Sequence, residues 1–181
     1  MKIVLTILVV VIVLIVVVYA YYGGFMSVKF EIKEQGGEVL VYEHVVGDYS
    51  QAGEVSDRVY QTLLHEENIA TTKGFGIFLD DPKSVEKSKL RSEIGCIVDT
   101  ADEALVARLS EKYNVKVFPK AKYASAEFPM KGKLSIFVGI MKVYPVLDKF
   151  CKEHNISGGA VMEIYDVPNK KTIYRDTKVI E

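Results

Sequence analysis

An acid and a phenol two residues apart form the most chemically suggestive pair in this sequence. Glu163 and Tyr165 lie in the apolar stretch Ala160 to Val167, which has the pattern of a buried strand and ends at Pro168. Because side chains alternate between the two faces of a strand, Glu163 and Tyr165 share one face. A carboxylate is costly to desolvate, so an acid at such a position is a candidate site. The open alternative is a Glu163 that is exposed, or paired with Lys or Arg, on a solvated sheet face.

The alternation also predicts what surrounds the pair. Ala160, Met162 and Ile164 take the opposite face of the strand and are expected in the core. A lipophilic cation would supply charge and apolar area to the acid, and aromatic rings would add cation–π attraction. The same pair could do acid–base chemistry, with Glu163 as the general base for water and the Tyr165 hydroxyl as the acid.

A stretch in the first half of the chain repeats this pattern. Gly74 to Pro82 is again an apolar strand that ends in acids and a proline. Pro82 and Pro168 are 86 residues apart, and aligning them sets Ile77 against Glu163. A unit that needs only a core has no reason to gain a buried acid. The alignment therefore marks the second copy as the one with a site.

Short motifs recur between the two halves in the same order. Val59-Tyr60-x-x-Leu63 returns 84 residues later as Val143-Tyr144-x-x-Leu147, and Arg91 returns as Arg175. In each half the expected order of elements is strand, helix, strand, strand. The simplest interpretation is that the chain contains the same structural unit twice.

The predicted fold class is α+β, a tandem pair of strand–helix–strand–strand units with a cleft between them. The units cover about 38–98 and 115–180, within one domain at 28–181. Small-molecule sites favour concave seams, so the cleft is the natural pocket. A turn is expected at Gln35 to Gly37, and a kink or break at Pro145. Strands are expected at 28–32, 38–44, 74–79, 90–98, 115–118, 123–128, 160–165 and 172–180, and helices at 50–68, 102–114 and 134–154.

The N-terminus has the composition of a membrane span. Ile3 to Ala20 contain no charge, and Thr6 is their only non-aromatic polar residue. Crossing a bilayer takes about 20 mostly apolar residues, which Ile3 to Tyr22 provide. Gly23-Gly24 then ends the helix. The sequence predicts one N-terminal transmembrane helix within residues 1–24 and a single-pass membrane location.

A cleaved signal peptide is the alternative for this segment. Lys2 would be its charged region, and Val18-Tyr19-Ala20 its cleavage site. The apolar run exceeds the usual length of about 7–15 residues, which favours an uncleaved anchor. Orientation depends on Lys2 before the span and on Lys29 and Lys33 after it. We expect the N-terminus inside and the domain outside the cytoplasm.

The overall composition excludes some partners. The chain of 181 residues has 23 basic and 24 acidic side chains and no basic run. A nucleic-acid partner would favour a basic face, so none is expected. His44, His65 and His154 lack metal-ligand spacing, and Cys96 and Cys151 lie far apart, so neither a metal nor a cofactor is predicted.

Three motifs resemble those of a known family. Gly76 to Pro82, followed by Lys89 to Gly95, is similar to a hydrophobic–Tyr–Asp–Asp/Asn–Pro segment and the Lys-Leu-Arg strand after it. Met162 to Tyr165 is similar to a Phe-Glu-Val-Tyr strand, and Gly47 to Gln51 to a Gly-Pro-Tyr/Trp-x-Gln helix entry. Over roughly Val28 to Ile180 the chain resembles the GyrI-like family. This small-molecule-binding domain is shared by the gyrase inhibitory protein and the effector domain of BmrR-type multidrug regulators.

The resemblance implies an aromatic-lined pocket between the two units, with Glu163 facing the ligand. Some relatives bind cationic, lipophilic drugs, and others are implied to hydrolyse strained cyclopropane-bearing natural products. A membrane-anchored eukaryotic branch, which shares the layout of this chain, includes a receptor for autophagy of the endoplasmic reticulum. As ligand-binding wall residues we predict first Tyr165 and Tyr49, then Tyr144 and Tyr60. The last two also lie at helical core spacing, which leaves a core position open for both.

Three hypotheses for function follow. The first is a membrane-anchored domain that binds small amphipathic or cationic molecules. The second is a membrane-tethered hydrolase that uses Glu163 and Tyr165. The third is a protein-interaction module that modulates a partner, whose identity the sequence does not indicate. A closed pocket would favour the first two, and a flat apolar patch with Glu163 at the surface would favour the third.

Overall fold

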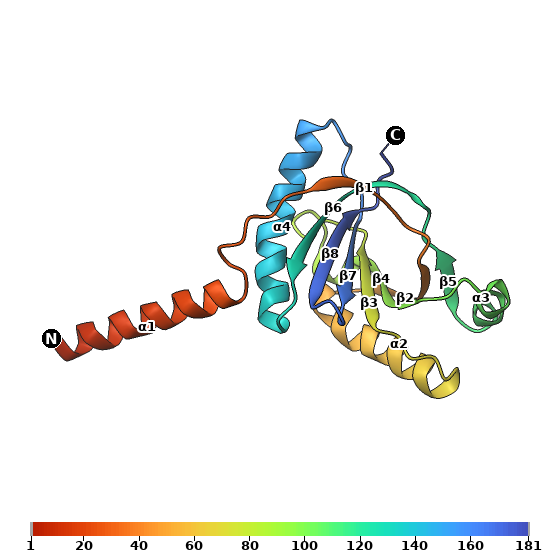
Figure 1. Cartoon of the computed structure of the whole chain (residues 1–181), viewed down its shortest axis with the longest axis horizontal. Coiled ribbons are helices and arrows are strands. Elements are labelled where there is room, and N and C mark those ends of the chain that lie inside the picture. The colour runs from red at the N-terminus through yellow and green to blue at the C-terminus, as the bar shows by residue number, and fades with distance from the viewer. Residues whose placement is uncertain (1, 181) are drawn as a thin grey trace.

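Two strand–helix–strand–strand units and two edge strands build one curled antiparallel sheet of eight strands within residues 2–180, the part of the chain that the computed structural model describes (Figure 1). The first unit comprises β2 (Val39–Val46), α2 (Ala52–Glu66), β3 (Lys73–Phe78) and β4 (Arg91–Val98). The second comprises β6 (Ala121–Pro129), α4 (Lys133–Glu153), β7 (Val161–Asp166) and β8 (Lys171–Asp176). The predicted tandem α+β fold is confirmed.

The two units meet in the middle of the sheet. The strand order is β1-β6-β8-β7-β3-β4-β2-β5, so β7 of the second unit pairs with β3 of the first. The edges are β1 (Glu31–Gln35) and β5 (Asn114–Val117). β1 precedes the first unit in the chain but pairs with β6, and β5 precedes the second unit but pairs with β2. Each unit thus receives an edge strand from the segment that leads into the other.

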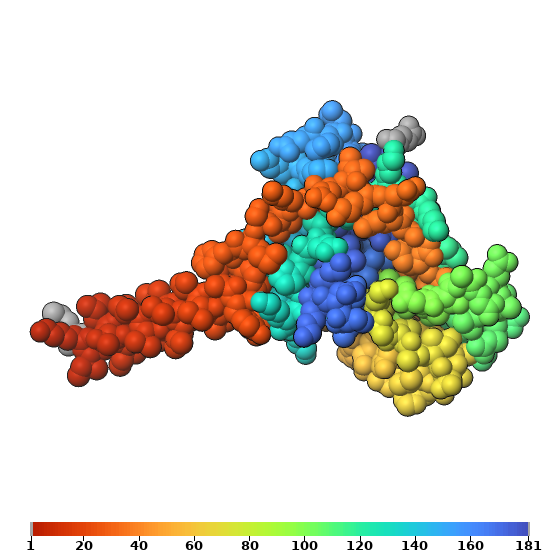
Figure 2. All heavy atoms as spheres, viewed as in Figure 1, coloured from red at the N-terminus to blue at the C-terminus, as the bar shows by residue number. Residues whose placement is uncertain are grey.

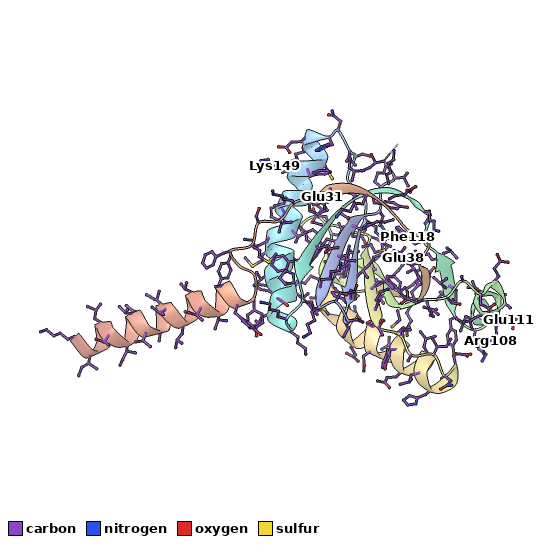
Figure 3. All side chains as sticks on the ribbon, viewed as in Figure 1. Glu31, Glu38, Arg108, Glu111, Phe118 and Lys149 are labelled. Carbon is purple, nitrogen blue, oxygen red and sulfur yellow. The ribbon has the colours of Figure 1, made fainter. Side chains whose placement is uncertain are left out.

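The links from β1 to β2 and from β5 to β6 hold opposite edges of the sheet together. The Gly37 amide donates to the Phe118 carbonyl at 2.6 Å, and the Phe118 amide donates to the Glu38 carbonyl at 2.8 Å. Gly36 has φ +107°, and a Cβ there would lie 1.9 Å from the Pro119 carbonyl oxygen. Only glycine permits this approach. Figure 3 shows Glu38 and Phe118 side by side at this junction.

A buried ion pair reinforces the junction. The Arg175 side chain, 3 % exposed, donates to both carboxylate oxygens of Glu38, at 2.7 and 3.2 Å, and to Gln35 at 2.8 Å. Bidentate pairs of this kind combine strength with directional specificity. The ion pair thus connects β8 to the link between β1 and β2.

The curl gives the sheet an inner and an outer face with different cores. A single inner cluster extends from β6 to β2, and the sheet must bend toward that side for such distant strands to touch. Its buried members are Leu40, Phe75, Ile77, Ile97, Phe118, Tyr123, Met162 and Ile164. The outer face carries two separate clusters, one under α4 and one under α2. The seam between them lies over β7 and β3.

The differences from the predicted elements lie mostly at strand ends. The first strand spans Glu31–Gln35 rather than 28–32, and it does not pair with the strand that follows it. The last strand spans Lys171–Asp176 rather than 172–180, and Ile180 forms only an isolated bridge. The ends of both strands depend on which strand pairs with them, and the local sequence does not encode the pairing.

The helix predicted at 102–114 is also shorter. α3 spans Glu103–Ser110 and is capped by Asp102, whose side chain accepts from two backbone amides. Asn114 already belongs to β5. Of the kink or break predicted at Pro145, the break is wrong, because α4 continues through this residue. Two short 3₁₀ helices, η1 (Tyr49–Gln51) and η2 (Lys87–Lys89), complete the described elements.

Helix α1 (Lys2–Tyr21) projects away from the sheet as a separate rod, and none of its residues is buried (Figures 1 and 2). By length and composition it is the one helix among the described residues that could cross a membrane. Near its end, Lys131 donates to the Tyr21 carbonyl at 2.9 Å and Lys142 donates to the Gly24 carbonyl. These lysines connect the end of α1 to the turn before α4, and the segment after α1 to the middle of α4.

Candidate functional site

The acid predicted from the sequence lies at the seam between the two units. Glu163 is in β7, directly opposite Gly76 of β3 on one side and Tyr174 of β8 on the other. It points to the outer face and is only 1 % exposed. β7 is central in the sheet, and its inner-face residues Met162 and Ile164 are buried as expected. Glu163 is therefore positioned by a fully paired strand.

Two phenols hold the carboxylate. The Tyr144 hydroxyl, from α4, donates to Oε1 at 2.8 Å, and the Tyr165 hydroxyl, from the same strand, donates to Oε2 at 2.8 Å. No Lys or Arg in residues 2–180 forms a salt bridge with Glu163. Both alternatives to a buried site, an exposed acid and an acid paired with a basic residue, are therefore wrong. The charge is buried against neutral donors alone.

Burial dominates the protonation of this group. It raises the pKa of Glu163, and the two phenolic hydrogen bonds oppose that rise only in part. Burial, followed by the negative charge of Glu163, raises the pKa of Tyr144 and of Tyr165. Both phenols therefore stay protonated and act as donors. A cation bound here would favour the ionised carboxylate, because opposite charge stabilises the charged form.

A glycine of the first unit, Gly76, lies directly opposite the acid. A Cβ at Gly76 would lie 2.9 Å from Cζ of Phe78 and 3.0 Å from Cδ1 of Ile94. Phe78 follows Gly76 on the same face of β3, and its ring stacks edge-on with Tyr49 at 4.7 Å between centroids. The first unit thus contributes an aromatic wall rather than a charge.

Tyr49 is fixed by its hydroxyl group. Its Oη donates to the Asp80 carbonyl at 2.8 Å and accepts from the Asp80 amide at 3.0 Å. Arg91 pairs with the Asp80 carboxylate through two nitrogens, at 2.7 and 3.0 Å. The Asp80-Asp81 motif is therefore turn chemistry that anchors the wall. Within residues 2–180 no group of three or more His, Cys, Asp and Glu is arranged to hold a metal ion.

The structure brings together some of the predicted site residues and separates one. Glu163, Tyr165 and Tyr144 are in direct contact, and Tyr49 lies on the wall formed with Phe78. Tyr60 instead packs against the core under α2 and makes no contact with the acid. A core position, which helical spacing also suggested for both helix tyrosines, describes both. Tyr60 packs against the buried cluster under α2 and Tyr144 against the one under α4, and only the Tyr144 hydroxyl also reaches Glu163.

Sequence reasoning missed two aromatic residues of this region. Tyr174 is fully buried beside Glu163, its ring 6.2 Å from that of Tyr144, and its hydroxyl has no hydrogen-bond partner among the described residues. Phe78 could have been found from its alternation with Gly76 along β3. Tyr174 could not, because its place beside Glu163 depends on the register between β7 and β8.

The fold and the site together define a class: a binding domain of two strand–helix–strand–strand units with a buried acid and aromatic residues at their seam. The model of the family described as "GyrI-like small molecule binding domain" matches residues 29–180. This chain belongs to that family. The resemblance read from its three motifs is confirmed.

The curated relatives share only about a quarter of their aligned residues with this chain. The mouse testis-expressed protein 264 homolog is 25 % identical over 132 residues, which cover 70 % of this chain and 41 % of that protein. Human testis-expressed protein 264 is 28 % identical over 99 residues, 51 % of this chain and 32 % of that protein. The chain thus spans less than half the length of the curated relatives it matches.

A solved structure shares the fold. SAV2435 bound to tetraphenylphosphonium superposes with a TM-score of 0.53 at 12 % sequence identity. The match covers 82 % of this chain and 92 % of that one. At this identity the likeness supports the fold.

Proposed function

We propose that this domain captures small lipophilic cations on Glu163, between the tyrosines of the seam. The observation that carries the proposal is a carboxylate that is 1 % exposed and held by two phenols without a basic partner. A bound cation would supply the missing charge, and the rings of Tyr144 and Tyr165 would add cation–π attraction. The tetraphenylphosphonium bound by SAV2435 is a ligand of this chemistry and supports the choice of class.

Entry of a ligand requires movement of the phenols rather than of the sheet. Tyr144 and Tyr165 are both half-buried, whereas Glu163 lies beneath them. The two phenols are only partly buried and each hydroxyl is held by one hydrogen bond, whereas the strands are fully paired, so we expect the hydroxyls rather than the sheet to yield to a cation. The same burial disfavours the protein-interaction hypothesis, because a partner surface would need an exposed acid. A general base would need water as well as substrate to reach Glu163.

We propose that α1 anchors this binding domain as a single membrane span. Its 20 residues carry only one charge, at Lys2, and none is buried against the domain. A helix of this length covers about 30 Å, the thickness of the hydrocarbon core. The organisation is then an anchor at residues 1–24 and a binding domain at 28–181, with the domain outside the cytoplasm. Protease protection of membranes tests the orientation, and the mass of the membrane-bound chain tests for signal cleavage.

Thermal unfolding of the fragment from Val28 onward tests the binding proposal. It retains all three cores, because α1 contributes no buried residue to them. Tetraphenylphosphonium should raise the unfolding free energy by about 2.7 kcal/mol at 100 times its Kd. Neutral triphenylphosphine oxide is the ligand control, and Glu163→Gln is the matched variant. An equal shift in Glu163→Gln, with that variant folded, would overturn the role of the acid.

A further inference from the structure

The first half of α4 exposes an apolar stripe that the sheet does not need. Leu134, Phe137 and Met141 are 53 %, 61 % and 63 % exposed. They are spaced three and four residues apart, so they lie on one side of the helix. The opposite side, with Gly139 and Val143, is buried against the sheet. A solvated helix face is normally polar, so this stripe indicates a partner.

The stripe ends halfway along the helix. The same side of α4 continues with Asp148 and Lys152, which are exposed and polar, and with the adjacent Lys149. Both halves pack one face on the same sheet, so the fold itself does not demand an apolar outer face in only one of them. Whatever covers the first half of α4 therefore does not extend to the second.

The location of the stripe identifies the partner. α4 begins beside the end of α1 and lies on the side of the domain from which α1 projects (Figures 1 and 2). Lys131 donates to the Tyr21 carbonyl, and its ammonium group lies 4.6 Å from the centre of the Tyr21 ring. An apolar groove between the two helices is lined by Leu134 and Val138 from α4 and by the second half of α1.

The length of α1 sets the level of the lipid surface. If α1 crosses the hydrocarbon core, Tyr21 lies where its aromatic ring and the ammonium group of Lys131 meet the headgroups. Phe25 and Met26, just beyond, are 69 % and 45 % exposed. Apolar side chains flanked by lysines are typical of a helix that rests in the bilayer interface.

We propose that the first half of α4, residues 133–141, together with Phe25 and Met26, seats the domain on the bilayer surface. The proposal rests on α1 being the anchor proposed above. Tyr144, which holds Glu163, lies three residues beyond Met141, about 4.5 Å along the helix axis. Seating therefore places the acid site beside the lipid interface, where lipophilic cations concentrate.

Tryptophan fluorescence of the full chain in phosphatidylcholine vesicles tests this seating. The chain contains no tryptophan, so a single introduced one reports without background. Phe137→Trp and Met141→Trp probe the stripe at two independent positions. Lys152→Trp is the matched control on the polar half of α4, and Val10→Trp marks the middle of α1. The quenchers are lipids brominated near the glycerol end or near the middle of the acyl chains.

The proposal expects shallow bromines to quench Phe137→Trp and Met141→Trp more strongly than deep bromines do, because the side chains lie at the headgroup boundary. Lys152→Trp should keep its emission, and Val10→Trp should respond to the deeper bromines. Quenching of Val10→Trp without quenching at either stripe position would overturn the seating and leave the anchor intact. Equal quenching of Phe137→Trp and Lys152→Trp would also overturn it. An unquenched Val10→Trp would overturn the anchor and the seating together.

Discussion

The two units share the same order of elements but place different side chains at the seam. On the outer face, β3 presents Gly74 and Gly76 where β7 presents Tyr165 and Glu163 directly opposite. The first unit supplies space and the second supplies the groups that fill it. A Cβ on Gly74 would lie 3.8 Å from the ring of Tyr165, and one on Gly76 would press on Phe78. The two copies thus differ at the seam in both strands, with glycines in one and the acid and phenol in the other.

The helices differ in the same way. Tyr60 of α2 and Tyr144 of α4 occupy equivalent places in the recurring Val-Tyr-x-x-Leu motif. Val59 and Val143 are both buried, so the helices pack alike. Only Tyr144 has a carboxylate within reach, and only Tyr144 makes the hydrogen bond. The hydrogen bonding of a repeated tyrosine thus depends on which side chain the neighbouring strand places within its reach.

The largest expected effect comes from giving both units an acid at the seam. Gly76→Glu would place a second carboxylate directly opposite Glu163 in the same buried seam. Desolvation, like-charge repulsion and contact with Phe78 should together cost more than about 3 kcal/mol. Urea unfolding of the fragment from Val28 onward measures the loss. A variant as stable as the wild type would contradict the close packing of the seam.

Removing the hydroxyl of one tyrosine in each unit should affect the unfolding free energy differently, although the two tyrosines are equivalent in the repeat. Tyr144→Phe leaves a buried carboxylate oxygen without its donor, which should cost about 1–3 kcal/mol. Tyr60→Phe is the matched control, and it should change the unfolding free energy by less than about 0.5 kcal/mol. Equal effects in urea unfolding would show that the bond to Glu163 contributes nothing special.

Neutralising the acid should change how stability depends on pH. A raised pKa means that the folded protein holds the Glu163 proton more tightly than the unfolded chain. Its contribution is complete below the ordinary carboxyl pKa of about 4.3 and is lost as the pH rises through the raised value. Glu163→Gln does not titrate and can still bond both phenols. Its unfolding free energy should gain on that of the wild type as the pH rises from the ordinary pKa to the raised one, by at most about 1.4 kcal/mol per pH unit, and the gain should then stay constant.

Urea unfolding of the same fragment between pH 4 and pH 8 measures this difference. The exposed Glu111→Gln serves as a control for the change in net charge. A difference between Glu163→Gln and wild type that stays constant with pH would contradict a raised pKa.

The smallest effects should have opposite signs in the two helices. Gly139→Ala in α4 would place a Cβ 2.5 Å from the buried Tyr174 hydroxyl, and overpacking should outweigh helix propensity by about 1 kcal/mol. Gly53 in α2 has nothing within 4 Å of its Cβ position, so Gly53→Ala should stabilise by about 0.5–1 kcal/mol. Thermal unfolding of both variants checks the signs. Stabilisation by both would mean that α4 can move away from β8.

The sequence predicted the identity of the acid but not its alignment with the first unit. Matching the prolines set Ile77 against Glu163, yet Ile77 pairs with Met162 and points into the inner core. A shift of one residue reverses the face of every side chain in a strand.

Local patterns alone determined the apolar N-terminal helix, the two amphipathic helices, the alternation around Glu163 and the order of elements in each unit. These features depend on the spacing of apolar residues within a few positions, which can be read from the local sequence. The tertiary structure decided which residues meet across the seam. Tyr174 and Gly76 flank Glu163 only because β8 and β3 pair with β7 in one register. Edge strands exchanged between the units, and an acid held by phenols rather than a cation, likewise result from contacts between residues far apart in the chain. Periodicity carries no record of such contacts.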